Sequence, residues 1–253
     1  MNERKAALVT GAAHRVGRAI ALHLAREGWD IGIHHNRSGA QAEKTAHEAQ
    51  AFGAKTQTFA CDLADVDAVE RLAADFCEAF PDAALLVNSA AVFERDTAET
   101  FDSRLFDRHI AINARAPVLL AKAFHSCAPQ QTCIINVLDQ KIASLTPDYF
   151  SYTLSKCALD AATRMLAMGL APKTRVNAIA PGILLQSGDL SREEFQRLHR
   201  DTILGIGASM EELCAAVSFF ARSPAVTGQV LVIDGGRHLV RTYPYEDLPK
   251  LKE

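Results

Sequence analysis

Short apolar runs alternate with longer stretches of helical spacing along this chain. The runs are apolar at successive positions, which is typical of strands buried on both faces of a parallel sheet, and they predict strands at 6–10, 30–35, 55–61, 84–88, 132–137, 174–179 and 229–233. Between them, apolar residues recur at every third or fourth position, which predicts helices at 15–27, 40–52, 64–80, 101–125, 149–170 and 210–221.

The repeated strand–helix–strand order predicts an α/β fold: a doubly wound, mostly parallel sheet of the Rossmann type with helices on both faces. The 253 residues fit one large domain with a sizeable core. No composition shift, linker or low-complexity segment divides the chain, so we expect a single domain over residues 1–253.

Two segments depart from the alternation. Residues 183–206 are polar and include Gln186, Ser187, Gly188 and Ser191, which favours one or two short helices over the carboxyl edge of the sheet, as a lid or as a plain surface insertion. The tail 241–253 is charged and contains proline, and it is either frayed or docked on a neighbouring subunit.

Composition excludes several classes of protein. The net charge is −3 with no basic block, which predicts no nucleic-acid partner. No apolar run reaches the roughly 18 residues of a membrane helix, and the start has no signal-peptide core, so we expect a cytoplasmic protein without a membrane partner.

Cysteine and histidine placement adds no metal or disulfide signal. The six cysteines are scattered without a CxxC pair, which favours reduced thiols and no disulfide framework. His34 and His35 are adjacent on a predicted strand and therefore point to opposite faces, so they cannot chelate an ion together. We expect no metal site.

The first predicted strand runs into a glycine-containing turn, Thr10-Gly11-Ala12-Ala13-His14-Arg15-Val16-Gly17, and then a helix. Gly11 lets the backbone approach a phosphate, and a helix N-terminus offers unpaired N–H groups with a positive dipole end. Glycines also serve ordinary turns, but the position in the first strand–helix unit favours a dinucleotide site.

The second predicted strand indicates which dinucleotide binds. It ends His35-Asn36-Arg37-Ser38, without the acidic residue that holds the ribose of NAD. Arg15 and Arg37 together with the Ser38 hydroxyl match a 2′-phosphate, so we predict NADPH (or NADP) over NADH, although each arginine is also compatible with a solvated loop. Asp62, after the third strand, either accepts from the adenine amino group or caps a helix.

Tyr152 and Lys156 are four residues apart and therefore share one face of a predicted helix. An ammonium beside a phenol lowers the pKa of the tyrosine toward working pH, which makes it a general acid, and Lys156 can also hold ribose hydroxyls. Alone, such a pair is compatible with a surface face. Its order after Gly11, Asn88 and Asn113 and before Pro181-Gly182 favours a catalytic role.

With these motifs the chain resembles the short-chain dehydrogenase/reductase family over nearly its whole length. The resemblance implies that Tyr152 donates a proton, that Lys156 binds the nicotinamide ribose, and that Asn113 helps hold a relay water. It also implies a homotetramer and a cofactor site. The residues of that site are Gly11, His14, Arg15, Val16, His35, Asn36, Arg37, Ser38, Asp62, Leu63, Asn88, Ser89, Ala90, Tyr152, Lys156, Pro181 and Gly182.

One departure from the family pattern points to the substrate. The family has a serine about thirteen residues before its tyrosine, where this chain has Asp139, and Ser144 is too close to Tyr152 to replace it. An ionised carboxylate opposes the alkoxide that forms during ketone reduction. It suits a substrate whose nitrogen gains a proton, which indicates a C=N bond.

Asp139, Tyr152 and Lys156, together with Arg15 and residues 35–38, closely resemble the pteridine reductase branch of the family. By that resemblance Phe93 stacks on the pterin and Tyr149 lines the pocket, and the substrate residues are Arg15, Phe93, Asp139, Tyr149 and Tyr152. Phe93 is alternatively an ordinary core residue. The ending Asp234-Gly235-Gly236-Arg237-His238-Leu239 is similar to bacterial dihydromonapterin reductases, whereas Leu184 replaces a serine of trypanosomatid pteridine reductases.

We therefore predict an NADPH-dependent reductase of dihydropterins, and the resemblance implies dihydromonapterin, dihydrobiopterin and dihydrofolate as substrates. Two alternatives remain: a carbonyl reductase of the same fold acting on a ketone or 3-oxoacyl substrate, and a non-catalytic NADPH-binding sensor. Asp139 argues against the first, and the intact Tyr152, Lys156 and Asn113 argue against the second.

Overall fold

A seven-stranded parallel sheet forms the centre of the computed structural model, which describes residues 4–129, 131–186 and 191–239. Residues 187–190 of the lid-like segment and the tail 241–253 lie outside these residues. The strand order is β3-β2-β1-β4-β5-β6-β7. The strands are β1 (Ala6–Val9), β2 (Asp30–His35), β3 (Thr56–Ala60), β4 (Ala83–Asn88), β5 (Thr132–Val137), β6 (Thr174–Pro181) and β7 (Val230–Ile233).

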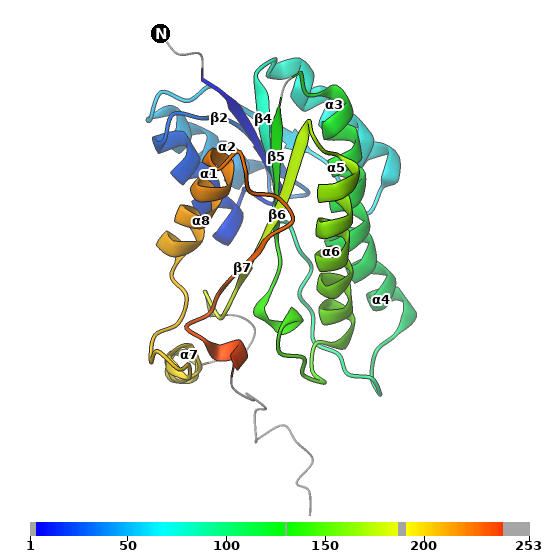
Figure 1. Cartoon of the computed structure of the whole chain (residues 1–253), viewed down its shortest axis with the longest axis vertical. Helices are drawn as coiled ribbons and strands as arrows, with labels where there is room; N and C mark the ends of the chain where they lie inside the picture. The colour runs from blue at the N-terminus through cyan, green and yellow to red at the C-terminus, as the bar shows by residue number, and fades with distance from the viewer. Residues whose placement is uncertain (1–3, 130, 187–190, 240–253) are drawn as a thin grey trace, which may run out of the picture.

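Helices cover both faces of this sheet, as Figure 1 shows. On one face lie α1 (Arg15–Arg26), α2 (Gly39–Gln50) and α8 (Met210–Arg222), and on the other lie α3 (Val66–Ala79), α4 (Ser103–Ile110), α5 (Ala116–Cys127) and α6 (Phe150–Gly169). Residues of β1 alternate between the two cores: Ala7 and Val9 pack with α1, and Leu8 packs with α3 and α5. The predicted doubly wound single-domain fold is confirmed.

The long helix expected at 101–125 is divided. It consists of α4, a five-residue π-helical segment, η1 (Ala111–Arg115), and α5, which has a proline in its first turn. Asn113 lies within η1. A π-helical turn displaces side chains from regular helical spacing and frequently occurs at functional sites, so this irregularity is relevant to the placement of Asn113.

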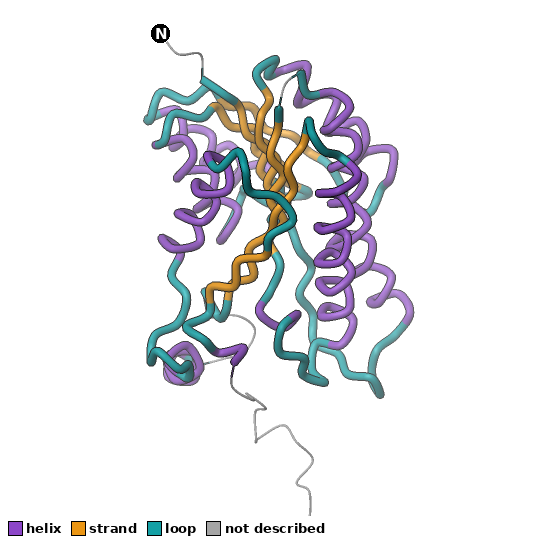
Figure 2. Tube along the Cα trace, viewed as in Figure 1, coloured by secondary structure: helices purple, strands orange, loops and turns teal. Residues whose placement is uncertain are grey.

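The lid-like segment contains one helix among its described residues, α7 (Arg192–Arg200), which begins at a capping box formed by Ser191 and Glu194. The guanidinium of Arg237, in the short helix η3 (Arg237–Leu239), donates to the carbonyl oxygens of Leu198 and Asp201 at 2.9 and 2.8 Å. These bonds dock the end of α7 on η3. Figure 2 shows loops and short helices gathered at this end of the sheet.

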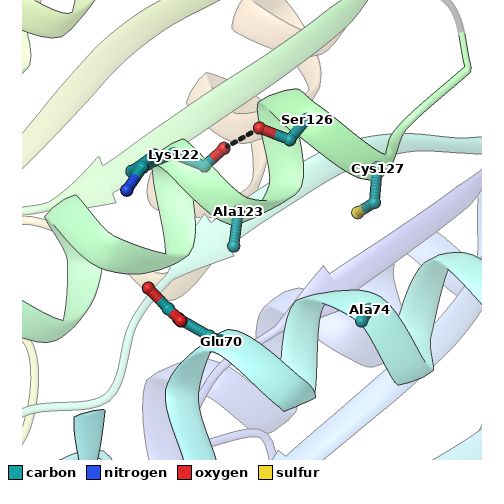
Figure 3. Close-up of a pocket in the computed structure, with 6 residues that line it drawn as sticks. All are labelled: Glu70, Ala74, Lys122, Ala123, Ser126 and Cys127. Atoms are coloured by element: carbon teal, nitrogen blue, oxygen red, sulfur yellow. Dashed lines mark hydrogen bonds between the residues drawn. The ribbon is translucent and has the colours of Figure 1, made fainter. Parts of the chain in front are cut away.

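The expectation of no disulfide is wrong for one pair. Cys77 and Cys127 form a disulfide between the ends of α3 and α5, across a Cα–Cα distance of 6.1 Å. Their separation of 50 residues in the chain concealed this proximity, which follows from the packing of the two helices. A surface pocket of about 300 Å³ adjoins Cys127 in Figure 3, between Glu70 of α3 and Lys122 of α5, and contains none of the predicted site residues.

Within the described part of the chain, no helix combines the length and apolarity that a bilayer crossing requires. The same residues contain no cluster of three or more His, Cys, Asp or Glu side chains arranged to hold a metal ion.

Candidate active site

Asp139, Tyr152 and Lys156 lie together at the carboxyl end of β5. Asp139 follows this strand, while Tyr152 and Lys156 are one turn apart on α6. The Tyr152 hydroxyl donates to Oδ2 of Asp139 at 3.0 Å. The Lys156 ammonium donates to the carbonyl of Val137 at 2.6 Å. The packing of α6 on the end of the sheet thus brings together the three groups that the sequence singled out.

The second oxygen of Asp139 is also engaged. Its Oδ1 accepts from the backbone N–H of Lys141 at 2.9 Å, so that Asp139 caps the short helix η2 (Gln140–Ile142). Burial raises the pKa of the Asp139 carboxyl above its usual value, although the bonds from Lys141 and Tyr152 oppose this effect. The carboxyl group therefore keeps its proton to a higher pH than an exposed aspartate does.

The expected lowering of the Tyr152 pKa is wrong in this structure. Burial, and then the neighbouring Asp139 carboxylate, raise the pKa of Tyr152 well above its ordinary value. Lys156 does not offset this because its Nζ lies 5.7 Å from the centre of the tyrosine ring and its own pKa falls to about 8 through burial. Tyr152 is consequently held as a protonated hydrogen-bond donor, paired with a carboxyl group.

Asn113 connects the loop after β4 with the catalytic helix. Its Oδ1 accepts from the N–H of Val92 at 2.8 Å, and its Nδ2 donates to the Val92 carbonyl at 2.9 Å and to the Ser155 hydroxyl at 3.0 Å. The side chain is buried and its polar atoms are occupied by protein. The structure therefore gives Asn113 a positioning role, and the water-holding role implied by the resemblance stays a prediction.

An aromatic cluster borders the Asp139–Tyr152 pair. Phe93 is 41% exposed, so it is not an ordinary core residue. Its ring stacks on Tyr149, with centroids 4.3 Å apart and planes 9° from parallel, and it meets the ring of Tyr152 edge-on at 4.7 Å. An exposed, flat apolar surface thus lies directly beside the proton-carrying groups.

The turn after β1 has the geometry of a phosphate-binding loop. Gly11 adopts a φ of +67°, and a Cβ on Gly17 would lie 2.4 Å from the Gly11 carbonyl oxygen, so the turn packs tightly on the helix. Helix α1 begins at Arg15, and its N-cap His14 makes no side-chain capping bond. The first N–H groups of this helix therefore lack intrahelical acceptors and can bind an anion.

The residues predicted to bind the 2′-phosphate are Arg37 and Ser38, which follow β2, and Arg15, which follows β1. Arg37 is exposed, and Ser38 stands at the N-cap of α2 without a capping bond, so its hydroxyl is not used by the helix. Arg15, with a φ of +47°, donates to the carbonyl oxygen of Gln186 at 3.0 Å. The structure thus joins Arg15 to the segment after β6.

One alternative for Asp62 is settled. Helix α3 is capped by Asp65, whose carboxylate accepts from the N–H of Ala68. Asp62 instead accepts from the N–H of Ala64 at 3.0 Å, within the turn that follows β3. The N-cap reading of Asp62 is wrong, while its predicted contact with adenine is not tested by this geometry.

The remaining cofactor residues lie at the same edge of the sheet. Asn88 ends β4 and donates to Asn136 at 2.8 Å, while its Oδ1 is buried without a partner. Pro181 ends β6, and a Cβ on Gly182 would lie 2.8 Å from Cβ of Asp234. The other positions at this edge, each at or just after the end of a strand or at the start of α1, are Val16, His35, Asn36, Leu63, Ser89 and Ala90.

These observations fit a bound dinucleotide. The sheet order reverses between β1 and β4, and ligands of open α/β sheets bind at such a point, outside the carboxyl ends of the strands. The free helix N-terminus, the glycine cradle and the unpartnered Asn88 oxygen all occur there. Sequence reasoning missed two buried residues at this edge, His34 and Asp96, because their partners are distant in the chain.

Comparisons with known proteins agree with this fold. Residues 11–238 match the model of the family described as enoyl-(acyl carrier protein) reductase. Crystal structures of FolM alternative dihydrofolate reductase 1 from Brucella canis and Brucella suis, both with NADP, share 38% identity and a TM-score of 0.90 with this chain. The similarity covers 95% of this chain and 96% and 97% of theirs.

Two curated relatives are more distant. An uncharacterized oxidoreductase of Mycobacterium tuberculosis is 30% identical, over 97% of this chain and 95% of its own length. The 3-oxoacyl-(acyl-carrier-protein) reductase FabG of Staphylococcus aureus is 28% identical, over 94% of this chain and all of its own. The expected NADP cofactor agrees with the two Brucella complexes. With its parallel sheet and its Tyr152–Lys156 pair, the chain belongs to the short-chain dehydrogenase/reductase family of oxidoreductases.

Proposed function

We propose that the protein is an NADPH-dependent pteridine reductase, which reduces a C=N bond of a dihydropterin. The observation that carries this proposal is the 3.0 Å hydrogen bond from the Tyr152 hydroxyl to Asp139, directly beside the exposed ring of Phe93. A hydroxyl and a carboxyl group that can supply a proton, beside a surface on which a flat ring can stack, support this substrate class.

The cofactor residues support NADPH as the reductant. The first turn of α1 and Gly11 bind the pyrophosphate, Arg37 and Ser38 bind the 2′-phosphate, and Lys156 binds the ribose next to the nicotinamide. When bound, NADPH supplies the hydride that is added to the ring carbon of the C=N bond.

The nitrogen of the same bond takes the proton. Tyr152 donates it at the phenol oxygen and is reprotonated from the Asp139 carboxyl, so that one hydride and one proton convert the dihydropterin to a tetrahydropterin and leave NADP⁺. Burial raises the pKa of both groups, so Tyr152 keeps its proton until the transfer, and the Asp139 carboxyl keeps its own proton to a higher pH than an exposed aspartate does.

Stacking positions the ring for this transfer. A pterin is flat and bicyclic, and the partly exposed ring of Phe93 offers it an apolar surface. Tyr149, parallel to Phe93 at 4.3 Å, borders the same space and limits the size of the group that enters it. The FolM structures support a substrate of this class, since their proteins are described as alternative dihydrofolate reductases.

Carbonyl reduction is the second candidate, favoured by the similarity to FabG. Asp139 opposes it, because it stands where the family carries the serine hydroxyl that donates to a substrate carbonyl, and its two oxygens already accept from Tyr152 and from the N–H of Lys141.

The test is NADPH oxidation by the purified protein with dihydromonapterin, dihydrobiopterin and dihydrofolate, beside a ketone and a 3-oxoacyl thioester. We expect turnover of at least one dihydropterin at a rate well above that of either carbonyl compound. Turnover of carbonyl compounds alone would contradict the substrate class, and NADPH binding without turnover of any compound would favour a sensor.

A further inference from the structure

We propose that His34 is the positioning residue of the dinucleotide site: one imidazole, with its proton on Nε2, fixes the phosphate turn relative to the end of β3. This inference rests on the NADP cofactor of the proposed function and is independent of the pterin substrate.

The two ring nitrogens bond to two different segments. The N–H of Gly11 donates to Nδ1 of His34 at 3.1 Å, and Nε2 lies 3.0 Å from the carbonyl oxygen of Cys61. A backbone N–H can only donate, so Nδ1 must accept and Nε2 must carry the proton that it donates to Cys61. The tautomer of His34 is thus set by its partners.

The backbone of β2 reinforces the same connection. The N–H of Ala12 donates to the carbonyl oxygen of His34 at 3.0 Å, and the N–H of Cys61 donates to that of His35 at 2.9 Å. His34 is 2% exposed, so neither side-chain bond competes with solvent. Three segments that are distant in the chain are thereby held in one arrangement.

Each of these segments carries a cofactor residue. Gly11, in its left-handed conformation, opens the turn that leads to the N-terminus of α1, and Cys61 immediately precedes Asp62. The pyrophosphate and the adenine of a bound dinucleotide are joined through a single ribose, which limits the distance between them. The turn and Asp62 must therefore be correctly spaced before the cofactor arrives, and His34 provides that spacing.

The electrostatic environment keeps the ring neutral. Burial lowers the pKa of His34 to about 4, with a further lowering from His35, while the Cys61 carbonyl and Asp62 oppose this. A charged ring would carry a proton on Nδ1 that faces the N–H of Gly11, so only the neutral form is compatible with both bonds.

Two variants of similar size distinguish the contribution of the hydrogen bond to Gly11 from that of the hydrogen bond to Cys61. In His34→Asn the side-chain oxygen can replace Nδ1 as acceptor for Gly11, but the bond to Cys61 is lost. In His34→Gln the longer amide can donate to Cys61, but the acceptor for Gly11 is lost. His34→Leu removes both. His125→Gln is the matched control, because it removes the 2.8 Å bond from Nδ1 of the partly buried His125 to Thr174, at the opposite end of the sheet.

The readouts are the Kd values of NADP and of 2′,5′-ADP, measured by calorimetry, and the Tm of the apoprotein. We expect the Kd of NADP to rise about 3- to 10-fold in the Asn and Gln variants and about 10- to 100-fold in His34→Leu. The Asn variant should weaken the binding of 2′,5′-ADP as much as that of NADP, because it frees the end of β3 next to Asp62. The Gln variant should weaken the binding of NADP more than that of 2′,5′-ADP, because it frees the pyrophosphate-binding turn at Gly11. His125→Gln lowers Tm and leaves both Kd values unchanged.

Unchanged Kd values in folded Asn and Gln variants would overturn the proposal, as would a loss of Tm without a loss of affinity. If His34→Leu does not fold, the Asn and Gln variants decide. Wild-type protein that binds NADP but reduces no dihydropterin would refute the substrate class and leave the role of His34 intact. Wild-type protein that binds neither NADP nor NADPH would refute both.

Discussion

Asp139 combines two tasks in one side chain. Its Oδ1 caps η2 and its Oδ2 accepts from Tyr152, so that the carboxyl group is fixed in position while its pKa is raised by burial. In the proposed mechanism, a serine in its place would retain a hydroxyl donor for a carbonyl oxygen but would lose the group that returns the proton to Tyr152.

We expect Asp139→Ser and Asp139→Ala to lower dihydropterin turnover by about 10²- to 10⁴-fold, the range for a positioned proton transfer. The Kd of NADPH should be unchanged. Steady-state kinetics and fluorescence titration of NADPH measure the two effects. Equal turnover in the variants and the wild type would show that Asp139 takes no part in the proton transfer.

The same residue fixes the sign of the pH dependence. Because its folded pKa is raised, Asp139 is protonated at low pH and loses its proton as pH rises through that value, so turnover should fall on the alkaline side. In Asp139→Asn the residual rate should lack this limb. A pH profile of kcat from pH 4 to 9 checks both enzymes.

We predict that Arg37 determines the choice between the two nicotinamide cofactors. It is exposed after β2, where an NAD site would carry an acid, and its guanidinium suits a 2′-phosphate. Arg37→Ala should raise the Kd of NADPH about 10- to 100-fold and barely change that of NADH. Arg164→Ala, which removes a surface pair with Asp160, is the control. An equal loss for both cofactors would contradict the phosphate role.

At the scale of elements, the catalytic helix is held at its N-terminus by a distant loop. The buried Asp96 accepts from both the N–H (3.0 Å) and the hydroxyl of Ser151 in the first turn of α6. The Asp96 carbonyl accepts from the N–H of Phe150 at 3.3 Å. Since the same loop carries Phe93, these bonds fix the stacking surface relative to Tyr152.

Removing this connection should cost stability. Asp96→Ala leaves a buried N–H of α6 unsatisfied, and we expect the free energy of unfolding to fall by about 1–3 kcal/mol. Ser151→Ala keeps the N–H bond and should cost less. Urea denaturation of both variants provides the comparison. A larger loss in Ser151→Ala than in Asp96→Ala would contradict this assignment.

The elements also show what a sequence can reveal. All seven strands were predicted, because buried parallel strands are apolar on both faces, and their observed ends differ from the predicted ends by two residues or fewer. The division of the helix at 101–125 was not predicted, since the apolar spacing continues through η1. A π-helical turn depends on tertiary contacts, here those of Asn113 with Val92 and Ser155.

The site was predictable where its residues are close in the chain or fixed to strand ends, as Tyr152, Lys156 and Asp139 are. The pKa of Tyr152 was not, because its direction depends on burial and on a 3.0 Å contact with Asp139. The bonds from His34 to Gly11 and from Asp96 to Ser151 span 23 and 55 residues, and periodicity carries no information about such pairs.

At the scale of the whole molecule, α6 has two faces of opposite character. Tyr152 and Lys156 point inward and are buried, whereas Leu154, Met165 and Met168 are exposed on the other side, Met165 by 67% and Met168 by 75%. Positions 154, 165 and 168 fall within about 60° of one another at 3.6 residues per turn, so they form one apolar stripe. Such a stripe is costly in water unless another surface covers it.

The homotetramer implied by the family would cover this stripe with a second copy of the same helix, since a two-fold interface pairs a surface with itself.

We predict that the double variant Met165→Glu, Met168→Glu has a lower molecular mass than the wild type in light scattering at the same protein concentration, because like charges would meet across the two-fold axis. Arg192→Glu in α7, a helix without buried residues, is the control. Turnover should fall together with the mass, because α6 carries the catalytic pair on its opposite face. A wild-type monomer, or an unchanged mass in the double variant, would refute this prediction.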